Sequence, residues 1–69
     1  MIEYDYGKID SIDAIIEDGE ARVTVEYKTG VRLRFTINDD DEDDITEEVA
    51  EEIDEDEDDV EDIIDFDYN

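Results

Sequence analysis

Two neighbouring segments in the first half of the chain alternate strictly between apolar and polar residues. In residues 21–28 and again in residues 31–37, every second side chain is apolar. This period predicts strands with one buried face and one solvent face. The apolar positions are Ala21, Val23, Val25, Tyr27, Val31, Leu33, Phe35 and Ile37. We therefore predict two strands joined as a hairpin.

The register of this hairpin follows from keeping the two apolar faces together. Pairing Tyr27 with Val31 does so, and it leaves a three-residue loop with Gly30 at the left-handed position. The same register places Glu26 opposite Arg32, which is a favourable cross-strand pair of charges.

A third alternating segment lies upstream, in residues 12–16. Asp18 and Gly19 follow it, and Asp-Gly is a preferred sequence for a two-residue hairpin turn. In that register Ile16 faces Ala21, so the apolar faces again coincide. The three strands together form an antiparallel meander.

The period changes after Asn38 to that of an amphipathic helix. A helix from about Asp44 to Ile64 would be roughly 30 Å long, and one apolar stripe would face the sheet. The acidic run 54–59 strains such a helix, so one long helix and two shorter helices joined at 54–59 are both allowed. Either Asp43 or Asp44 can serve as N-cap. The stripe consists of Ile45, Val49, Ile53, Val60, Ile63 and Ile64, interrupted by Asp56.

Both ends of the chain also show period two. Residues 2–6 can form a further short strand whose partner is not fixed, and residues 64–68 can form a fourth or fifth strand or a frayed tail. The expected fold is α+β: an antiparallel meander of three to four strands with an acidic C-terminal helix packed on one sheet face. We expect a single domain over 1–69, with the sheet in 1–38 and the acidic helical part and tail in 39–69.

Charge changes this picture, because the chain carries 28 acidic residues against 5 basic ones and a net charge of −23. Residues 1–37 hold all the bases, whereas residues 38–69 hold 20 acids and no base. Self-repulsion at this density opposes compaction and favours solubility. The first residues lack the pattern of a signal peptide, and no apolar run is long enough for a membrane span. We expect a cytoplasmic protein.

The residue types present exclude most catalytic chemistry. The chain has no cysteine and no histidine, which excludes disulfides and the usual zinc sites. The one serine, Ser11, has no candidate base beyond a carboxylate. An EF-hand loop starting at Asp39 would need Gly at its sixth position and Glu at its twelfth, where Asp44 and Ala50 stand. We expect no enzyme activity, no cofactor and no dedicated metal site.

The acids themselves remain as the candidate binding surface. Residues 44–64 hold 13 acids, about one per 2.3 Å along a helix, against one phosphate per ~1.7 Å in duplex DNA. The bases Arg22, Lys28, Arg32 and Arg34 are expected to pair within the molecule with Asp13, Glu26 and nearby acids. The predicted partner-binding residues are Asp39, Asp40, Asp41, Glu42, Asp43, Asp44, Glu47, Glu48, Glu51, Glu52, Glu55, Asp58, Asp59 and Asp62.

In composition and charge spacing, mainly over 39–62, the chain resembles phage-type acidic DNA-mimic inhibitors of the anti-restriction and anti-CRISPR class. The resemblance implies competitive inhibition of a host defence or DNA-handling protein. The partner would be a basic nucleic-acid-binding protein or a ribonucleoprotein effector in the host cytoplasm, without direct contact to nucleic acid or membrane. The inhibitor would be a monomer or a homodimer.

Three other functions have the same electrostatic signature. A small halophilic module would carry abundant Asp and Glu and few lysines. An acidic chaperone or antitoxin-like protein would bind a basic protein without competing with nucleic acid. In the third case, the segment from Asp39 onward would be a disordered acidic arm that folds when it binds its partner.

Overall fold

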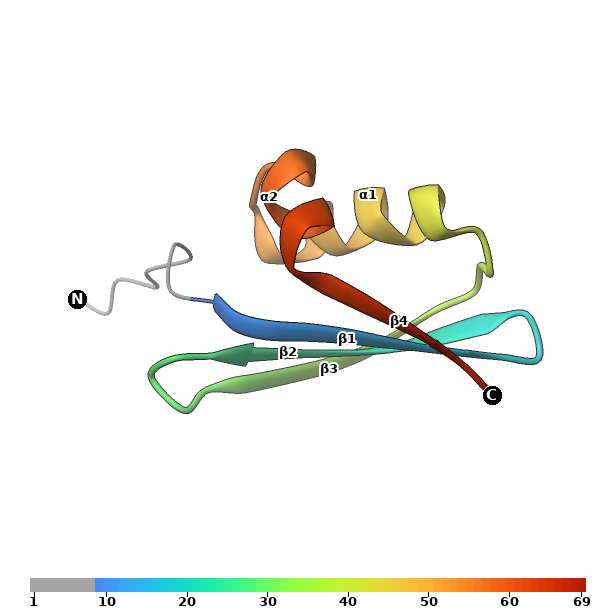
Figure 1. The fold of residues 1–69 in the computed structure, drawn as a ribbon, viewed down its shortest axis with the longest axis horizontal. Helices are drawn as coiled ribbons and strands as arrows, with labels where there is room; N and C mark the ends of the chain where they lie inside the picture. Colours follow the sequence, from blue (N-terminus) through green and yellow to red (C-terminus); the bar gives the residue numbers. More distant parts are fainter. Residues whose placement is uncertain (1–8) are drawn as a thin grey trace.

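The computed structural model describes residues 9–69, in which two helices cover one face of a four-stranded sheet (Figure 1). The chain is α+β, as its periodicities predict. The elements, in chain order, are β1 (Ile9–Glu17), β2 (Glu20–Tyr27), β3 (Arg32–Ile37), α1 (Glu42–Ile53), α2 (Glu57–Ile63) and β4 (Ile64–Tyr68). The predicted strand in residues 2–6 lies outside the described residues.

The turn between β1 and β2 has the geometry that its sequence predicts. Asp18 and Gly19 both have positive φ, 53° and 76°, as a type I′ turn requires. The turn sets Ile16 opposite Ala21, which confirms the predicted register.

The second hairpin is also confirmed. The Tyr27 N–H donates to the Val31 carbonyl at 2.9 Å, and Gly30 has a φ of 93°. Glu26 lies opposite Arg32 in the ladder. The two side chains form an ion pair with an N–O distance of 3.1 Å.

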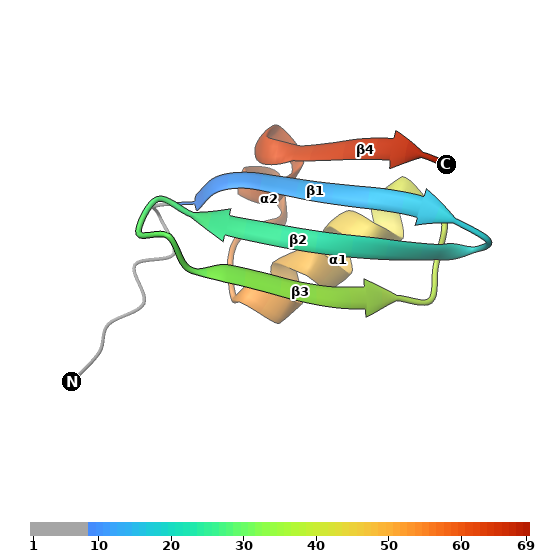
Figure 2. The ribbon, with the colours of Figure 1, turned by 90° about the horizontal axis from the view of Figure 1, so that it is seen from below.

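β4 shows that the sheet is mixed, so the prediction of a purely antiparallel sheet is wrong. Figure 2 shows the order β3-β2-β1-β4, with β4 parallel to β1. The chain leaves β3 at one edge, passes through both helices and returns at the opposite edge beside β1. A long helical crossover of this kind is what parallel pairing needs. Residues 64–68 are therefore a strand, with Ile64 beside Ile12 and Tyr68 beside Ile16.

The helical region is broken, which confirms the two-helix alternative. Asp54 ends α1 in the left-handed conformation, with φ 56° and ψ 48°. The Glu55 N–H then donates to the Ala50 carbonyl at 2.9 Å, which closes the last turn. Six successive acids from 54 to 59 repel one another in a continuous helix, and the break separates them.

Asp41, and neither Asp43 nor Asp44, caps the start of α1. Its carboxylate accepts hydrogen bonds from the N–H groups of Asp43 at 2.9 Å and Asp44 at 3.4 Å. An N-cap needs an extended backbone, which Asp41 has with φ −85° and ψ 124°. Asp43 and Asp44 are already inside the helix.

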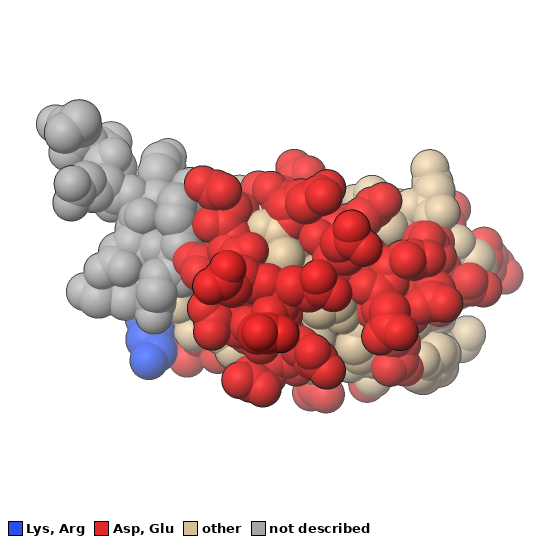
Figure 3. All heavy atoms as spheres, turned by 90° about the horizontal axis from the view of Figure 1, so that it is seen from above, with Lys and Arg blue, Asp and Glu red and all other residues tan. Residues whose placement is uncertain are grey.

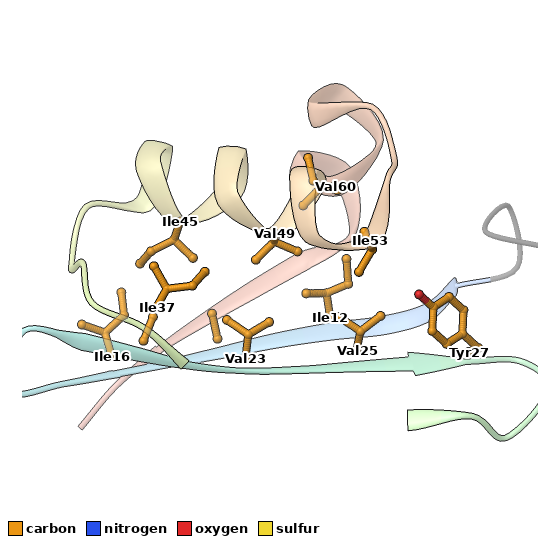
Figure 4. Packing of buried hydrophobic residues seen from close by; sticks show 13 residues of the cluster. Ile12, Ile16, Val23, Val25, Tyr27, Ile37, Ile45, Val49, Ile53 and Val60 are labelled. Atoms are coloured by element: carbon orange, nitrogen blue, oxygen red, sulfur yellow. The ribbon is translucent and has the colours of Figure 1, made fainter. Parts of the chain in front are cut away.

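The core lies between the helices and the sheet (Figure 4). Four residues of the predicted stripe are buried there: Ile45, Val49, Ile53 and Val60. Ile63 is exposed and Ile64 belongs to β4, so the stripe was wrong at its end. The break restarts the helical phase, which rotates Ile63 away from the core. The sheet contributes Ile12, Ala14, Ile16, Ala21, Val23, Val25, Tyr27 and Ile37.

Candidate functional site

The surface of the two helices and their connections is almost entirely acidic (Figure 3). We call the Asp and Glu side chains between residues 39 and 62 the acidic layer. All fourteen predicted binding residues belong to it, and all are exposed except Asp39 and Glu55, which are partly buried. The prediction missed four exposed members: Asp54, Asp56, Glu57 and Glu61. Counting every acid outside the apolar stripe would have found them.

Three acids near the start of α1 hold the fold together. The Asp39 carboxylate accepts a hydrogen bond from the Asp41 N–H at 2.9 Å, and Asp41 caps the helix. The Glu42 carboxylate accepts a hydrogen bond from the Tyr68 hydroxyl, which ties β4 to α1. These three side chains position the acidic layer, and they are less available to a partner than their neighbours.

The central acids of α1 have no such use. Glu47, Glu48, Glu51 and Glu52 are exposed, and none of their carboxylates forms a hydrogen bond or an ion pair with another residue of the described part. Neither helix has a basic residue in its last turn, where a cation would suit the helix dipole. The acids at i and i+4 also repel one another. This charge therefore opposes helix stability.

Crowding of carboxylates shifts the pKa of Asp44. Repulsion from Asp39 raises the pKa of Asp44 above its ordinary value of 3.8, and a hydrogen bond with Asp39 and repulsion from Asp41 add to it. A raised folded-state pKa means that protonation favours folding. The stability that protonation of Asp44 contributes is fully present below the pKa of the unfolded state, and it is lost as the pH rises through the pKa of the folded state. At neutral pH the fold therefore keeps Asp44 ionised although neighbouring carboxylates repel it.

The acidic layer is a patch rather than the continuous rod predicted. α1 carries 7 acids in 12 residues, which is one per about 2.6 Å over roughly 18 Å. α2 packs against α1 instead of extending it, and it adds five acids beside the first row. The spacing in each row is wider than the ~1.7 Å of duplex DNA, but the two rows lie side by side.

The basic side chains lie on the other side of the molecule or at its end. Arg22, Arg32 and Arg34 are on the outer sheet face, opposite the helices, and Lys28 is in the β2–β3 loop. Within residues 9–69, Arg32 alone of these four forms an ion pair, with Glu26. The predicted pairing of the other three with nearby acids is not found in this part of the chain. Arg22 lies opposite Ile15, two positions along β1 from Asp13. Such diagonal neighbours are within reach of a long side chain, yet the two form no ion pair within residues 9–69.

The hydrogen bond between Tyr68 and Glu42 makes stability sensitive to alkaline pH. It is the largest cause that raises the pKa of Tyr68 above 10.0. A raised pKa in the folded state contributes stability that is fully present below pH 10 and is lost as the pH rises through the pKa of folded Tyr68. We expect wild type to lose more stability between pH 8 and 11 than Tyr68→Phe, which starts less stable. Urea unfolding followed by circular dichroism measures both.

The comparison between the two proteins controls for the other tyrosines, because they are the same in both. Parallel stability profiles across this pH range would show that the Tyr68 hydroxyl does not stabilise the docking of β4.

Within residues 9–69 the carboxylates nowhere gather in a group of three or more that could hold a metal ion. No helix in the same part is long and apolar enough to cross a membrane.

Comparisons with known proteins give no further guide to the site: no protein-family model matches the chain, and neither does any curated protein or solved structure.

Proposed function

We propose that the protein is a non-catalytic inhibitor whose acidic layer mimics the nucleic-acid backbone and occupies the basic surface of a nucleic-acid-binding protein. The observation that carries the proposal is that exposed carboxylates cover both helices, and that those at the centre of α1 are unpaired within residues 9–69 and repel one another. Charge that serves folding would be capped or ion-paired. Charge kept at a cost to folding has a use outside the molecule.

The mechanism is electrostatic competition. A surface that binds nucleic acid carries Lys and Arg side chains spaced to meet phosphates, and these side chains hold counterions when free. The acidic layer displaces those ions, and its field speeds association with an oppositely charged partner. Because both effects weaken with ionic strength, affinity should fall steeply as salt is added.

The arrangement of the two layers supports this function. The sheet holds α1 and α2 side by side through the core, so the carboxylates keep fixed positions without a partner. A preorganised surface loses less conformational entropy on binding than a flexible acidic tail. Arg22, Arg32 and Arg34 lie on the opposite face, where they do not neutralise the field.

A pulldown with competition tests the proposal. The protein is immobilised at low salt, exposed to host lysate, and eluted with a salt gradient, with and without excess duplex DNA. We expect a nuclease, a nucleoid protein or a ribonucleoprotein effector to be retained and then lost to DNA. A partner that DNA does not displace would favour a chaperone or antitoxin-like function, and the absence of any partner would favour a halophilic module.

A further inference from the structure

We propose that two copies of this chain dimerise through the outer faces of their sheets, which are self-complementary in charge. The outer face is the one turned away from the helices, and within residues 9–69 no element covers it (Figure 2). This inference goes beyond the proposed function and does not depend on it.

The outer face contains two arginines without partners. Arg22 and Arg34 are exposed, and neither guanidinium forms an ion pair or a hydrogen bond with a side chain of residues 9–69. They flank a hollow of about 350 Å³, and an exposed isoleucine, Ile15, lies on its far side. The remaining lining residues are Val23, Thr24, Phe35 and Thr36.

In two central rows of this face, strand register places acids at the opposite edge from the arginines. One row across the sheet runs from Asp65 on β4 through Asp13 and Thr24 to Arg34 on β3. Arg34 and Asp65 are three strands apart, or about 14 Å, so they cannot pair within one chain.

The neighbouring row repeats this polarity. It runs from Asp67 through Ile15 and Arg22 to Thr36. In both rows the acid is on β4 and the arginine is on β2 or β3. These two rows therefore give the centre of the face an acidic edge and a basic edge, whereas Glu20 and Glu26 lie at the two ends of β2.

A two-fold axis parallel to the strands joins these halves. It places β3 of one copy over β4 of the other and β2 over β1. Arg34 then meets Asp65 of the second copy, and Arg22 meets Ile15 of the second copy. Each contact occurs twice, as an isologous interface requires. An axis perpendicular to the strands would place β3 over β3 and set Arg34 against Arg34, so the charges of the two central rows select the first arrangement. The axis parallel to the strands also sets Glu17 against Glu20 of the second copy at the hairpin end, which weakens the dimer.

The arrangement also fills the hollow. The hollow lies over β2 and β3, and the two-fold axis brings Ile15 and Asp65 of the second copy over it. Sheets that pack face to face are about 10 Å apart, which leaves room for interdigitating side chains. The long side chain of Arg34 spans part of that distance. An apolar centre is thus flanked by ion pairs.

Repulsion between the two highly charged copies limits this dimer but does not forbid it. The acidic layers lie on the outer sides of the sandwich, on the order of 30 Å apart. At 0.15 M salt the Debye length is about 8 Å, so this repulsion is largely screened. The four strands offer only about 400–500 Å² per copy, at the low end for specific interfaces. We therefore expect a weak dimer that dissociates at ~10 mM salt, where the Debye length is about 30 Å.

Sedimentation velocity from about 10 μM to 1 mM protein at ~0.15 M salt tests the interface. Wild type should pass from monomer to dimer over this range. Arg34→Glu and Asp65→Arg should each remain monomeric, because each sets like charges against one another. The double variant Arg34→Glu/Asp65→Arg should dimerise again, since the swapped charges meet in the second copy.

Lys28→Glu is the matched control, because it changes the charge as Arg34→Glu does but lies in the loop 28–30. It should dimerise like wild type. Far-UV circular dichroism confirms that each variant is folded. A wild type that stays monomeric throughout, or a double variant no better than the single ones, would overturn the proposal. A dimer that forms best at low salt would also overturn it.

Discussion

Ile12→Ala is expected to lower the free energy of unfolding by about 2–5 kcal/mol, through lost apolar burial and the cavity left behind. Ile12 is 0% exposed, and it lies in β1 between β2 and β4, pointing toward the helices beside Ile53 (Figure 4). A domain of this size has a total stability of about 3–10 kcal/mol. Charge repulsion lowers this further, so a large share of the variant should be unfolded. Urea unfolding at ~0.15 M salt gives the difference.

Ile15→Ala is the matched control for this substitution. It removes the same atoms from the same strand, but Ile15 is 38% exposed and faces away from the core. At micromolar concentration, where the monomer dominates, we expect a loss below about 1 kcal/mol. Added salt should partly restore the helicity of Ile12→Ala, because it screens the carboxylates. Equal losses in the two variants would contradict the placement of the core on the helix side of the sheet.

The local structure of the sheet could be predicted because short-range chemistry determines it. Asp18 and Gly19 tolerate positive φ, and the alternation of apolar residues allows one register for each hairpin. The position of Glu26 opposite Arg32 then follows from parity alone. These features depend on residues that are close together in the chain.

The placement of β4 could not be predicted in the same way. Period two in residues 64–68 indicates a strand, but it does not say which edge the strand joins or in which direction it runs. Both depend on where the helices end after the turn at Asp54. The run of six acids from 54 to 59 is compatible both with one continuous helix and with two shorter helices. The run of acids from 39 to 44 likewise offers several candidate N-cap residues for α1.

The binding residues were predicted from charge alone, and that prediction could not separate acids by their local use. The sequence does not distinguish Asp41, which caps α1, from Asp43, which points to solvent. It also does not reveal that Glu42 holds Tyr68, because the two residues are 26 positions apart. The sequence identified an acidic surface, whereas its shape as a two-helix patch required the fold.

Neutralising the centre of α1 is expected to weaken partner binding by about a hundredfold or more while making the protein more stable. The variant replaces four exposed glutamates by glutamine and changes the net charge from −23 to −19. Glutamine and glutamate have similar helix propensities, so the change isolates charge. The substitutions are Glu47→Gln, Glu48→Gln, Glu51→Gln and Glu52→Gln.

The two effects have one cause. Removing like charges at i and i+4 relieves about 0.2–0.5 kcal/mol per pair, or roughly 1 kcal/mol in total. Each lost carboxylate also leaves a Lys or Arg of the partner without a counter-charge, at a cost of about 0.5–1 kcal/mol. Urea unfolding measures the first effect, and a competition assay against labelled duplex DNA on the captured partner measures the second.

A second variant with the same net charge separates local from overall electrostatics. It neutralises four acids of the β1–β2 hairpin, which belong to neither helix: Asp10→Asn, Glu17→Gln, Asp18→Asn and Glu20→Gln. If the acidic layer is the binding surface, this variant should keep most of its affinity. Equal losses would mean that the partner responds to total charge, and α1 would not be the interface. A loss of affinity together with a gain in stability, confined to the helix variant, would show that charge on α1 is maintained for binding against its cost to the fold.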